Sequence, residues 1–458
     1  MRLSEAATFL GGELIGDDLE FFSVSTDTRT LQAGDVYVAL KGPRFNGHQH
    51  VAEAREKGAK ALIVSESIKD SQPKIQVKNT LLALGQLASA WMHQFDPVTV
   101  AVTGSCGKTS VKEMLMNILS QQGNTLATEG NFNNEIGVPL TMLRVEQDHQ
   151  YAVVEMGANQ LGEIAYTSGL VMPDVALITN AAAAHIEGFG SADNVAKAKG
   201  EIYSGLKASG TAIVNKDDRY ADFWMGLLSG KKARTFSLGN PEADCYASAL
   251  SVNELGQFSF VLHVDQQTIP VALSLLGRHN VINAVAAAAA ASAAGASMAA
   301  IKAGLEKCRA IQGRLFPTQI DGLNIIDDSY NANPASIEAA ADLLAEIKGV
   351  RCMVLGDMAE LGTHATTLHA NVGRYVAEKG IDVLIAKGKH AADYFVGFTE
   401  KKSAGKRCFR YQEYAEIVEH LRSQLPGATI LLKGSRSTTM EKIIEMMTEE
   451  LPSAEDTN

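Results

Sequence analysis

The residues of this chain whose types and spacing could do chemistry gather first in a glycine-rich loop between an apolar strand and an amphipathic helix. The loop residues are, in order, Gly104, Ser105, Cys106, Gly107, Lys108, Thr109 and Ser110. Backbone N–H groups in such a loop, aided by the positive end of the following helix, bind phosphate oxygens, and a Lys-Thr pair serves the terminal phosphates and Mg²⁺. Val102 stands where the common G-x-x-x-x-G-K-[ST] pattern has its first glycine. The strand expected over 98–102 and the helix expected over 111–120 still favour a nucleoside triphosphate site over a plain turn.

Three more polar residues lie at positions where chemistry is possible. Glu155 ends an apolar segment, and His185 comes shortly after the next one. Open α/β sheets place ligands at the carboxyl ends of their strands, so Glu155 could complete a Mg²⁺ site beside Thr109 rather than be a solvated acid. A lone histidine is more often structural than a ligand, and Lys199, in a helix expected over 192–206, would by default be a surface lysine. Spacing alone assigns neither His185 nor Lys199 a role.

One motif points toward a different class of protein. Residues 215–218 read Asn-Lys-Asp-Asp and match the N-K-x-D pattern that reads guanine in GTPases. The first glycine of the phosphate loop is missing, however, and Glu-Met-Gly at 155–157 stands where a GTPase would have Asp-x-x-Gly. These two differences argue against a GTP switch.

Length and composition indicate a globular protein of several domains. The 458 residues suffice for about three domains, and 46% hydrophobic with 20% charged residues fits an ordinary globular chain. The apolar stretch 284–300 is mostly alanine and serine, so it predicts one tightly packed internal helix rather than a membrane span. The first residues lack the pattern of a signal peptide, and we therefore expect a cytoplasmic protein.

The charge balance and the cysteines exclude other classes. With 41 basic and 52 acidic residues the net charge is −11, which argues against a general nucleic-acid surface. The cysteines show no C-x-x-C spacing and suggest neither a zinc site nor a disulfide framework; they are Cys106, Cys245, Cys308, Cys352 and Cys408. Cys106 is expected to be a small loop residue rather than a nucleophile.

Apolar runs that alternate with helical segments predict an α/β fold in three domains. We expect a small N-terminal α/β domain over 1–80, a central P-loop-type domain with a mostly parallel sheet over 81–310, and a C-terminal Rossmann-like domain over 311–458. Strands are expected over 35–40, 61–64, 98–102, 151–155, 174–179, 211–214, 323–326, 351–355, 383–386 and 429–432. Residues 246–276 break the pattern and predict an antiparallel appendage.

Taken as a set, the motifs resemble a known family. The segments that carry the resemblance are 103–114, 129–139, 155–157, 185, 198–203, 277–283, 313–314 and 327–334. Together they resemble the Mur ligases of peptidoglycan synthesis, and the likeness runs across essentially the whole chain. Residues 25–29 and 46–48 resemble the region of that family that binds UDP. The resemblance implies an N-terminal domain that holds UDP, a central ATPase domain and a C-terminal domain that closes over the nucleotide.

The resemblance also implies roles for individual residues. The UDP-linked substrate would contact Thr26, Thr28, Arg29, Asn46, Gly47, His48, Asn131 and Asn134. ATP would contact the phosphate loop together with Asn280, Asn283, Arg314 and Asp328. Catalysis would depend on Lys108, Lys199, His185 and Glu155. Two Mg²⁺ ions would be held by Thr109, Glu155, His185 and Lys199, the last as a carbamate that turns a repelled cation into an oxygen ligand.

Several of these assignments have alternatives. Lys197 lies close to Lys199, although the surrounding Lys-Gly-Glu-Ile-Tyr sequence favours Lys199 as the modified residue. The two asparagines near 280 could instead cap the helix that follows. Tyr330 occupies a position where relatives often carry Lys or His, so its role stays open. Residues 356–362 and 433–437 follow strands and would shape the pocket of the second substrate.

The implied activity is ATP-dependent amide formation through an acyl phosphate, with D-alanyl-D-alanine and a UDP-N-acetylmuramoyl-tripeptide as substrates. The expected protein is a monomer that neither binds nucleic acid nor inserts into a membrane. Whether the third residue of the tripeptide is diaminopimelate or lysine stays open. The rival hypotheses are a folylpolyglutamate synthase, a Mur ligase that adds one amino acid, and a guanine-preferring nucleotide switch without ligase chemistry.

Overall fold

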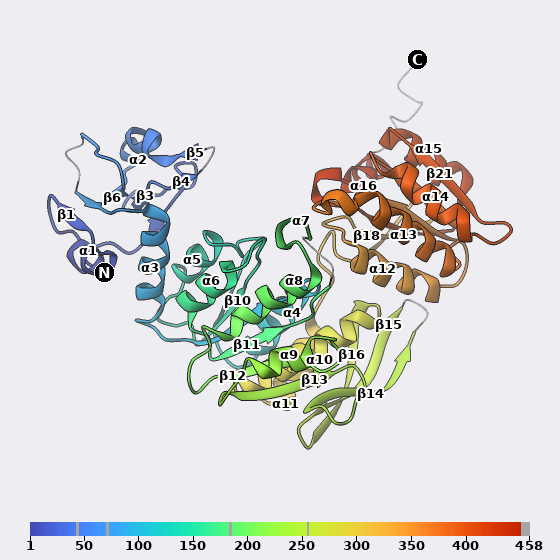
Figure 1. Cartoon of the computed structure of the whole chain (residues 1–458), viewed down its shortest axis with the longest axis horizontal. Coiled ribbons are helices and arrows are strands. Elements are labelled where there is room, and N and C mark those ends of the chain that lie inside the picture. The colour runs from blue at the N-terminus through green and yellow to red at the C-terminus, as the bar shows by residue number, and fades with distance from the viewer. Residues whose placement is uncertain (43–44, 70–72, 183–185, 254–255, 450–458) are drawn as a thin grey trace, which may run out of the picture.

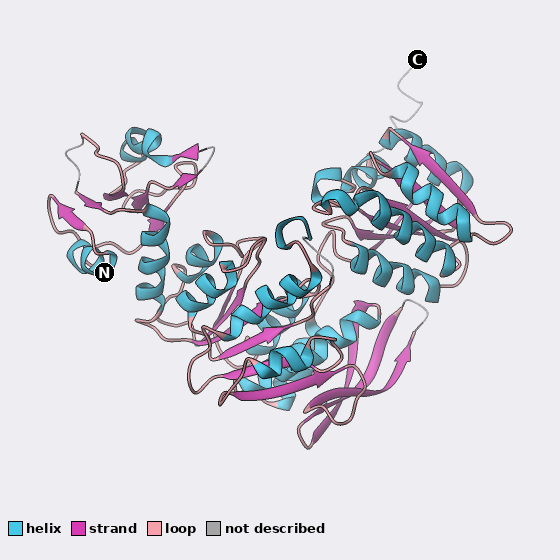
Figure 2. Ribbon diagram, viewed as in Figure 1, coloured by secondary structure: helices cyan, strands magenta, loops and turns pink. Residues whose placement is uncertain are grey.

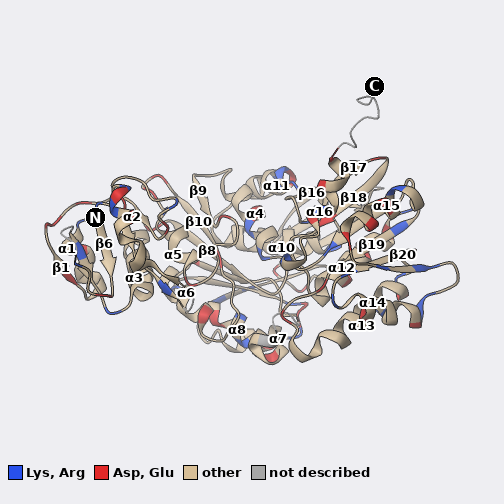
Figure 3. Cartoon of the chain, turned by 90° about the horizontal axis from the view of Figure 1, so that it is seen from above, with Lys and Arg blue, Asp and Glu red and all other residues tan. Residues whose placement is uncertain are grey.

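The computed structural model describes residues 1–42, 45–69, 73–182, 186–253 and 256–449. They form three α/β domains in chain order, each built on its own sheet, with helices packed on the sheets (Figure 1, Figure 2). This confirms the expected three-domain α/β fold. Basic and acidic residues are both found in all three domains (Figure 3). Within the described ranges, no helix is both long and apolar enough to cross a membrane.

The N-terminal domain is a five-stranded sheet in the order β1-β7-β6-β3-β2, parallel except for the pairing of β1 with β7. Its elements are α1 (Leu3–Leu10), β1 (Glu13–Ile15), β2 (Val24–Ser25), β3 (Val36–Val38), β4 (Lys41–Gly42), β5 (Phe45–Asn46), η1 (Gly47–His50), α2 (Val51–Glu56), β6 (Ala61–Val64) and β7 (Lys74–Gln76). Because β2 and β3 are parallel neighbours, the loops after them lie at the same sheet edge.

Helix α3 (Thr80–Met92) joins the first two domains. Asn79 starts it by accepting hydrogen bonds from the N–H groups of Leu81 and Leu82 at 2.9 and 3.1 Å. Its first half packs in the N-terminal core through Leu84 and neighbouring residues. Its second half packs in the core of the central domain, where Met92 is buried. The helix therefore belongs to both cores and fixes the two domains to each other.

The central domain holds the longest alternation of strands and helices. Its elements are β8 (Val98–Thr103), α4 (Lys108–Leu119), β9 (Thr125–Ala127), α5 (Gly137–Met142), β10 (Tyr151–Glu155), α6 (Glu163–Val171), β11 (Val175–Ile178), α7 (Ile186–Phe189), α8 (Ala192–Gly200), η2 (Glu201–Tyr203), β12 (Thr211–Asn215), α9 (Ala221–Gly226), β13 (Lys232–Ser237), β14 (Cys245–Val252), β15 (Gln257–Val264), β16 (Gln267–Leu276), α10 (Arg278–Ala293) and α11 (Met298–Lys307). The helix expected over 192–206 thus ends at Gly200 and continues only as the short η2.

The central sheet has nine strands in the order β16-β15-β14-β13-β12-β11-β8-β10-β9. The expectation of an antiparallel appendage over 246–276 is wrong in one respect, because β14 pairs in parallel with β13 and so continues the same sheet. The antiparallel pairings of this sheet are those of β15 with β14 and of β15 with β16. Buried residues line both faces of the sheet, for example Val100 on one and Ala101 on the other.

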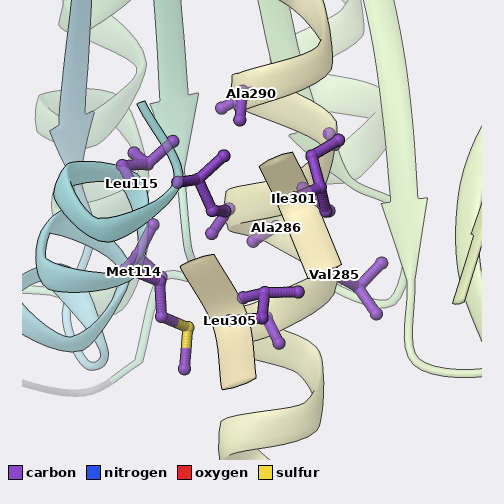
Figure 4. Packing of buried hydrophobic residues seen from close by; sticks show 14 of the residues in the cluster. Met114, Leu115, Val285, Ala286, Ala290, Ile301 and Leu305 are labelled. Atoms are coloured by element: carbon purple, nitrogen blue, oxygen red, sulfur yellow. The ribbon is translucent and has the colours of Figure 1, made fainter. Parts of the chain in front are cut away.

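The alanine-rich segment forms two helices rather than the one expected over 284–300. Helix α10 ends at Ala293, Gly295 adopts a left-handed φ of 92°, and α11 begins at Met298. Residues 284–291 are all buried, which fits a helix that is apolar on every side. Figure 4 shows where α4, α10 and α11 meet; the labelled side chains are Met114, Leu115, Val285, Ala286, Ala290, Ile301 and Leu305. The alanines let this central helix approach its neighbours closely.

Gly304 gives a stability prediction for this contact. A Cβ at this position would overlap the backbone Cα and N of Ile118 on α4, so the two helices could not keep their distance. We expect Gly304→Ala to lower the free energy of unfolding by about 1–3 kcal/mol. The matched control is Gly169→Ala on α6, where nothing lies within 4 Å of the added Cβ. We expect Gly169→Ala to raise the free energy of unfolding by about 0.4–1 kcal/mol. Equal changes in stability of both variants, measured by calorimetry, would contradict the predicted overlap at Gly304.

The C-terminal domain has a six-stranded sheet in the order β17-β18-β22-β19-β20-β21, parallel except for the β17–β18 hairpin. Its elements are β17 (Phe316–Ile320), β18 (Leu323–Asp328), α12 (Pro334–Glu346), β19 (Arg351–Leu355), η3 (Gly362–His364), α13 (Ala365–Glu378), β20 (Val383–Lys387), α14 (Ala391–Lys401), β21 (Arg407–Tyr411), α15 (Tyr414–Gln424), β22 (Thr429–Lys433), η4 (Arg436–Thr438) and α16 (Glu441–Thr448). Helices α12, α13 and α14 pack on one face of the sheet, and α15 and α16 pack on the other.

Candidate active site

The glycine-rich loop between β8 and α4 has the backbone of a phosphate cradle. Gly104 and Gly107 adopt φ values of 150° and 83°, which side chains rarely tolerate. A Cβ at Gly107 would lie 2.5 Å from Oδ1 of Asn283, and a Cβ at Gly104 would overlap the hydroxyl of Thr179. Both glycines are therefore required by conformation and by close approach, and helix α4 begins directly after Gly107.

The segment that follows β11 holds this loop in place. The N–H of Ser105 donates to the carbonyl of Asn180 at 3.0 Å, and the N–H of Cys106 donates to its Oδ1 at 3.0 Å. The hydroxyl of Thr179 donates to the carbonyl of Cys106 at 2.6 Å. The predicted strand-loop-helix geometry is thus present, and these hydrogen bonds fix the loop. Its remaining N–H groups and the dipole of α4 suit an anion.

Lys108 folds back over the loop. Its Nζ donates to the carbonyl of Gly104 at 2.7 Å. Burial lowers the pKa of Lys108, and the negative charge of Glu155 opposes that shift. The side chain therefore places a cation at the mouth of the cradle, next to the carboxylate at the end of the neighbouring strand.

Glu155 ends β10, which is the parallel neighbour of β8, and its side chain is only 2% exposed. Nδ2 of Asn133 donates to its Oε1 at 2.8 Å, whereas Oε2 is buried without a hydrogen-bond partner among the described residues. A buried, unpartnered carboxylate oxygen costs free energy unless a cation or donor binds it. The oxygen thus fits a divalent cation held together with Thr109 and phosphate oxygens, because Mg²⁺ takes oxygen ligands and keeps several waters.

Lys199 on α8 is buried rather than at the surface, with 2% exposure. Its Nζ lies 5.8 Å from the centroid of the Phe189 ring and makes no ion pair or hydrogen bond with a described residue. Burial, together with the positive charge of Lys108, lowers the pKa of the Lys199 ammonium to about 7. Lys197, the alternative, is exposed. The expectation of a surface lysine is therefore wrong for Lys199.

These groups face one cleft of about 600 Å³ between the central and C-terminal domains. The sequence-predicted residues that line it are Ser105, Cys106, Gly107, Lys108, Thr109, Ser110, Asn131, Asn134, Glu155, Lys199, Asn280, Asn283, Arg314 and Asp328. Within the described ranges no three His, Cys, Asp or Glu side chains gather as a ready-made metal cage.

The C-terminal wall of the cleft is formed by charged residues at strand ends. Nζ of Lys433 lies 2.5 Å from Oδ2 of Asp328 and 2.9 Å from the carbonyl oxygen of Asn331. Burial raises the pKa of Asp328, and the charge of Lys433 opposes the rise. The guanidinium carbon of Arg314 lies 4.3 Å from the ring centroid of Tyr330. Tyr330, whose role was open, is thus a stacking platform on this wall.

The central and C-terminal walls of the cleft contact each other directly. Sγ of Cys106 in the phosphate loop lies 3.6 Å from Oδ1 of Asn333. Asn333 is the N-cap of α12 and accepts from the N–H of Ser336 at 2.9 Å, with Pro334 as the first helical residue. Cys106 therefore lies at the contact between the central and C-terminal domains.

Asn280 and Asn283 do not cap helix α10, whose N-cap is Gly277. Nδ2 of Asn280 donates to the carbonyl of Leu276 at 2.8 Å, and Nδ2 of Asn283 donates to Oδ1 of Asn280 at 3.1 Å. The two amides form a chain that ends at the phosphate loop, since Oδ1 of Asn283 packs against Gly107. The capping alternative is thus wrong, and both side chains face the cleft.

The predicted UDP-site residues lie in the N-terminal domain, away from this cleft. Thr26, Thr28 and Arg29 follow β2, while Asn46, Gly47 and His48 end β5 and start η1. The second group is tied to β3, the parallel neighbour of β2, because the hydroxyl of Tyr37 donates to the carbonyl of Gly47 at 3.1 Å. The carbonyl of Thr28 accepts from Nζ of Lys57, just after α2, at 2.8 Å. Arg29 is exposed and paired with Asp27.

His48 and Asn46 also build their own loop. Nδ1 of His48 donates to Oδ1 of Asn46 at 2.7 Å, and Nε2 accepts from the N–H of Ser65 at 2.9 Å. Burial lowers the pKa of His48, which suits this neutral, doubly bonded imidazole. Both side chains thus have a structural role whether or not they also contact a ligand.

Two sequence-level candidates need separate mention. His185 lies outside the described residues. In the Asn-Lys-Asp-Asp segment, Nδ2 of Asn215 donates to the carbonyl of Thr179 at 2.7 Å, and Oδ2 of Asp218 accepts from the N–H of Ala181 at 2.8 Å. These side chains brace the loop behind the cleft and are not among its lining residues, so they are not placed to read a guanine.

Sequence reasoning gave no individual role to three residues of the site. Asn133 holds Glu155, Lys433 pairs with Asp328, and His279 lines the cleft. Burial, with the charge of Lys433, lowers the pKa of His279 to about 4, so its imidazole is neutral at pH 7. All three lie in segments that the sequence had singled out, 129–139, 277–283 and 433–437, and that membership was the available signal.

Comparisons with known proteins match the whole length of the chain. The Mur ligase middle domain family matches residues 102–291, the Mur ligase glutamate ligase domain matches 313–436, and the Mur ligase family catalytic domain matches 20–92. The UDP-N-acetylmuramoyl-tripeptide--D-alanyl-D-alanine ligase of Escherichia coli (strain K12) is 45% identical over 456 residues, 98% of either chain. The Bacillus subtilis (strain 168) protein of the same name is 35% identical over 93% of either chain.

Solved structures agree with these relatives. MurF from Acinetobacter baumannii is 36% identical and covers 98% of either chain with a TM-score of 0.90. The MurF ligase of Thermotoga maritima in complex with ADP has a TM-score of 0.82 at 27% identity, over 93% of this chain and 96% of that one. A Mycobacterium tuberculosis folylpolyglutamate synthase has a TM-score of 0.64 at 14% identity, over 81% of this chain and 95% of that one, which shows a shared fold alone.

Proposed function

The chain belongs to the Mur ligase family, and on that premise we propose that it joins D-alanyl-D-alanine to UDP-N-acetylmuramoyl-tripeptide during synthesis of peptidoglycan precursors. Like the family, it is an ATP-dependent amide ligase. The observation that carries the proposal is the cleft in which the phosphate loop, Lys199 and the free oxygen of Glu155 face the strand ends of the C-terminal domain. The chain's 45% identity to the ligase of that name over 98% of its length supports the choice of substrates.

The reaction must bring two anions together. The γ-phosphate of ATP is attacked by the terminal carboxylate of the tripeptide, and the γ-phosphoryl group moves to that carboxylate with release of ADP. Lys108 and the N–H groups of the phosphate loop neutralise charge on the transferring group. The acyl phosphate then has a good leaving group. The amine of the dipeptide attacks the acyl carbon, loses a proton, and inorganic phosphate leaves.

Magnesium fits the donors that the cleft offers. Thr109, Glu155 and, outside the described residues, His185 would hold the ions with phosphate oxygens as further ligands. When bound, Mg²⁺ supplies positive charge between the phosphate and the carboxylate that attacks it. The orphaned oxygen of Glu155 supports this assignment, and Asn133 keeps the other oxygen occupied.

Carbamylation of Lys199 completes the proposal for the second ion. Only a neutral amine adds CO₂, and the buried amine of Lys199 has a pKa of about 7, so a large fraction is neutral near that pH. The amine nitrogen bonds to the carbon of CO₂ and loses one proton to solvent, so the product is an anion with two oxygens where an ammonium would carry a positive charge. This change removes the repulsion between Lys199 and Lys108 and adds a ligand for Mg²⁺.

The remaining roles follow the domain order. We assign the UDP moiety to the N-terminal domain, expected over 1–80, ATP to the central domain, expected over 81–310, and closure over the nucleotide to 311–458. Asn280 and Asn283 would bind the adenine, and Arg314 and Asp328 would approach the nucleotide from the hinge and the closing domain. A monomeric state and a cytoplasmic location belong to the same proposal.

Isotope transfer tests the reaction itself. A tripeptide substrate labelled with oxygen-18 in its terminal carboxylate should pass one labelled oxygen into the inorganic phosphate released by the ligation, as mass spectrometry would detect. Unlabelled phosphate during productive ligation would rule out an acyl phosphate. A control without D-alanyl-D-alanine should release little phosphate.

A substrate panel separates the ligase from its rivals. Phosphate release should require ATP, the muramoyl tripeptide and D-alanyl-D-alanine together, and comparison of diaminopimelate and lysine tripeptides would identify the third residue. Activity with folate and glutamate, or with a single amino acid in place of the dipeptide, would favour the corresponding relative instead. Preference for GTP would favour the nucleotide switch.

A further inference from the structure

Three neighbouring strands of the central sheet end in loops that contact one another. Strand β11 lies between β12 and β8, and all three strands are parallel, so the loops after them lie at the same sheet edge. The Asn-Lys-Asp-Asp segment starts at the last residue of β12, residues 179–182 follow β11, and the phosphate loop follows β8. The proposed reaction uses the phosphate loop and gives the Asn-Lys-Asp-Asp segment no task.

The loop after β11 is bonded to the first residues of the phosphate loop. Asn180 accepts from the N–H groups of Ser105 and Cys106 at 3.0 Å each. The hydroxyl of Ser105 in turn accepts from the N–H of Ala182 at 3.0 Å. These bonds leave the N–H groups at the start of α4 for an anion. A displacement of the loop after β11 would therefore displace the phosphate loop as well.

Asn215 and Asp218 hold the loop after β11 from the opposite side. Nδ2 of Asn215, which is 5% exposed, donates to the carbonyl of Thr179 at 2.7 Å. Oδ2 of Asp218 accepts from the N–H of Ala181 at 2.8 Å, and its Oδ1 accepts from the N–H of Tyr220 at 3.0 Å. The loop after β11 is thus bonded on one side to the phosphate loop and on the other to the Asn-Lys-Asp-Asp segment.

Asp217 lies next to Asp218 in the chain but bonds in the other direction. Its Oδ1 accepts from the hydroxyl of Ser237 at 2.6 Å, and its Oδ2 accepts from the N–H of Leu238 at 2.7 Å. Ser237 ends β13, which neighbours β12 on the side away from the phosphate loop. Each aspartate therefore accepts two hydrogen bonds from the protein, and of the two it is Asp218 that bonds the loop after β11.

We propose that Asn215 and Asp218 are positioning residues for ATP, because through the loop after β11 they hold the phosphate loop in the conformation that binds phosphates. This inference rests on the proposed function, since it takes the phosphate loop as the ATP site. A cradle binds an anion well when its N–H groups are already aimed, because ordering them on binding costs affinity. The segment that matches a guanine-reading motif thus acts on the phosphates from behind the loop and not on the base.

The test compares Asp218→Ala with Asp217→Ala, since each variant removes one carboxylate and two hydrogen bonds from the same turn. In Asp218→Ala the KM for ATP and the dissociation constant of ADP with Mg²⁺, from calorimetry, should rise by about 10-fold. The KM for the UDP-linked tripeptide should stay unchanged. In Asp217→Ala both nucleotide constants should stay within about twofold of those of the unmodified enzyme. Loss of a negative charge by itself favours an anionic nucleotide, so weaker binding in Asp218→Ala reports lost positioning.

Hydrogen exchange in the protein without nucleotide gives a second readout that requires no ligand. In Asp218→Ala the amides of residues 105–106 and 181–182 should exchange faster than in the unmodified protein, because the loop after β11 has lost a support. In Asp217→Ala those amides should keep their exchange rates, and the amide of Leu238 should exchange faster instead. A merely structural role would change both variants alike.

An Asp218→Ala enzyme whose nucleotide constants equal those of Asp217→Ala overturns the proposal, and so does one whose phosphate loop exchanges no faster. If the unmodified chain binds neither ATP nor ADP, the proposed function fails and this inference fails with it, which the unmodified chain alone would reveal. If the unmodified chain binds nucleotide and both variants bind it equally well, this inference alone fails. Should Asp218→Ala not fold, as circular dichroism would show, Asp218→Asn decides by the same comparison, with Asp217→Asn as its control.

Discussion

Lys199→Ala should lower kcat by about 1000-fold, because it removes the group expected to supply a metal-binding carbamate in the cleft. The same variant should fold at least as well as the natural chain. The amine is 2% exposed and makes no ion pair or hydrogen bond with a described residue, so its burial costs stability. Lys199→Met, which fills the same volume, should be more stable by calorimetry and equally inactive. A loss of activity without a loss of stability identifies a functional residue rather than a structural one.

Chemical rescue distinguishes the carbamate from a simple amine. Acetate or formate should restore part of the activity of Lys199→Ala, because a small acid can place carboxylate oxygens in the space left by the side chain. Lys197→Ala, two residues away and exposed, should keep nearly full activity and should not respond to acetate. Enzyme exposed to ¹³CO₂ should show a carbamate carbon signal that is absent from Lys199→Ala. Full activity of Lys199→Ala without added acid would refute the role.

Lys108→Ala should lower kcat by about 1000-fold for a different reason. The side chain is the cation that crosses the phosphate cradle, with Nζ 2.7 Å from the carbonyl of Gly104, and it would neutralise the phosphoryl group during transfer. Binding of the UDP-linked tripeptide, measured by calorimetry, should change little, because its UDP moiety is assigned to another domain. A kcat within about tenfold of the natural enzyme would contradict the assignment.

The control for Lys108 is Lys216→Ala. Lys216 belongs to the Asn-Lys-Asp-Asp segment and pairs at the surface with Glu242 at 3.1 Å. Its loss should leave kcat and the preference for ATP unchanged and cost less than about 1 kcal/mol in stability.

The effects of Lys108→Ala and Lys199→Ala should not add, because the charge of Lys108 contributes to the low pKa of Lys199. A double variant no worse than either single variant would show this coupling.

Much of the site could be predicted from the sequence because its signals are local. Residues 98–120 contain, within one short segment, a strand, two glycines with positive φ and a Lys-Thr pair. This segment alone therefore predicts the strand-loop-helix geometry of the phosphate loop. Glu155 followed from the rule that ligands gather at the carboxyl ends of strands, and β10 does lie beside β8. Alternating apolar segments likewise sufficed for the three-domain α/β class.

Expectations that depend on distant contacts were less accurate. The alanine-rich segment was expected as one helix, but Gly295 ends it, because only that bend lets α11 pack against α4. The antiparallel segment looked like an appendage because no local pattern shows that β14 would pair with β13. Asn280 looked like a helix cap, but its side-chain amide donates to the carbonyl of Leu276, the last residue of β16, and caps no N–H group of α10.

By itself, the sequence determined the elements, the phosphate loop and the family, because periodicity, turn residues and motif spacing act over a few neighbouring residues. Only the tertiary structure decided that Lys199 is buried near Lys108, that one oxygen of Glu155 has no partner among the described residues, and that Arg314 stacks on the Tyr330 ring. Burial and the charge of neighbours set these properties, and both depend on residues that are far apart in the chain.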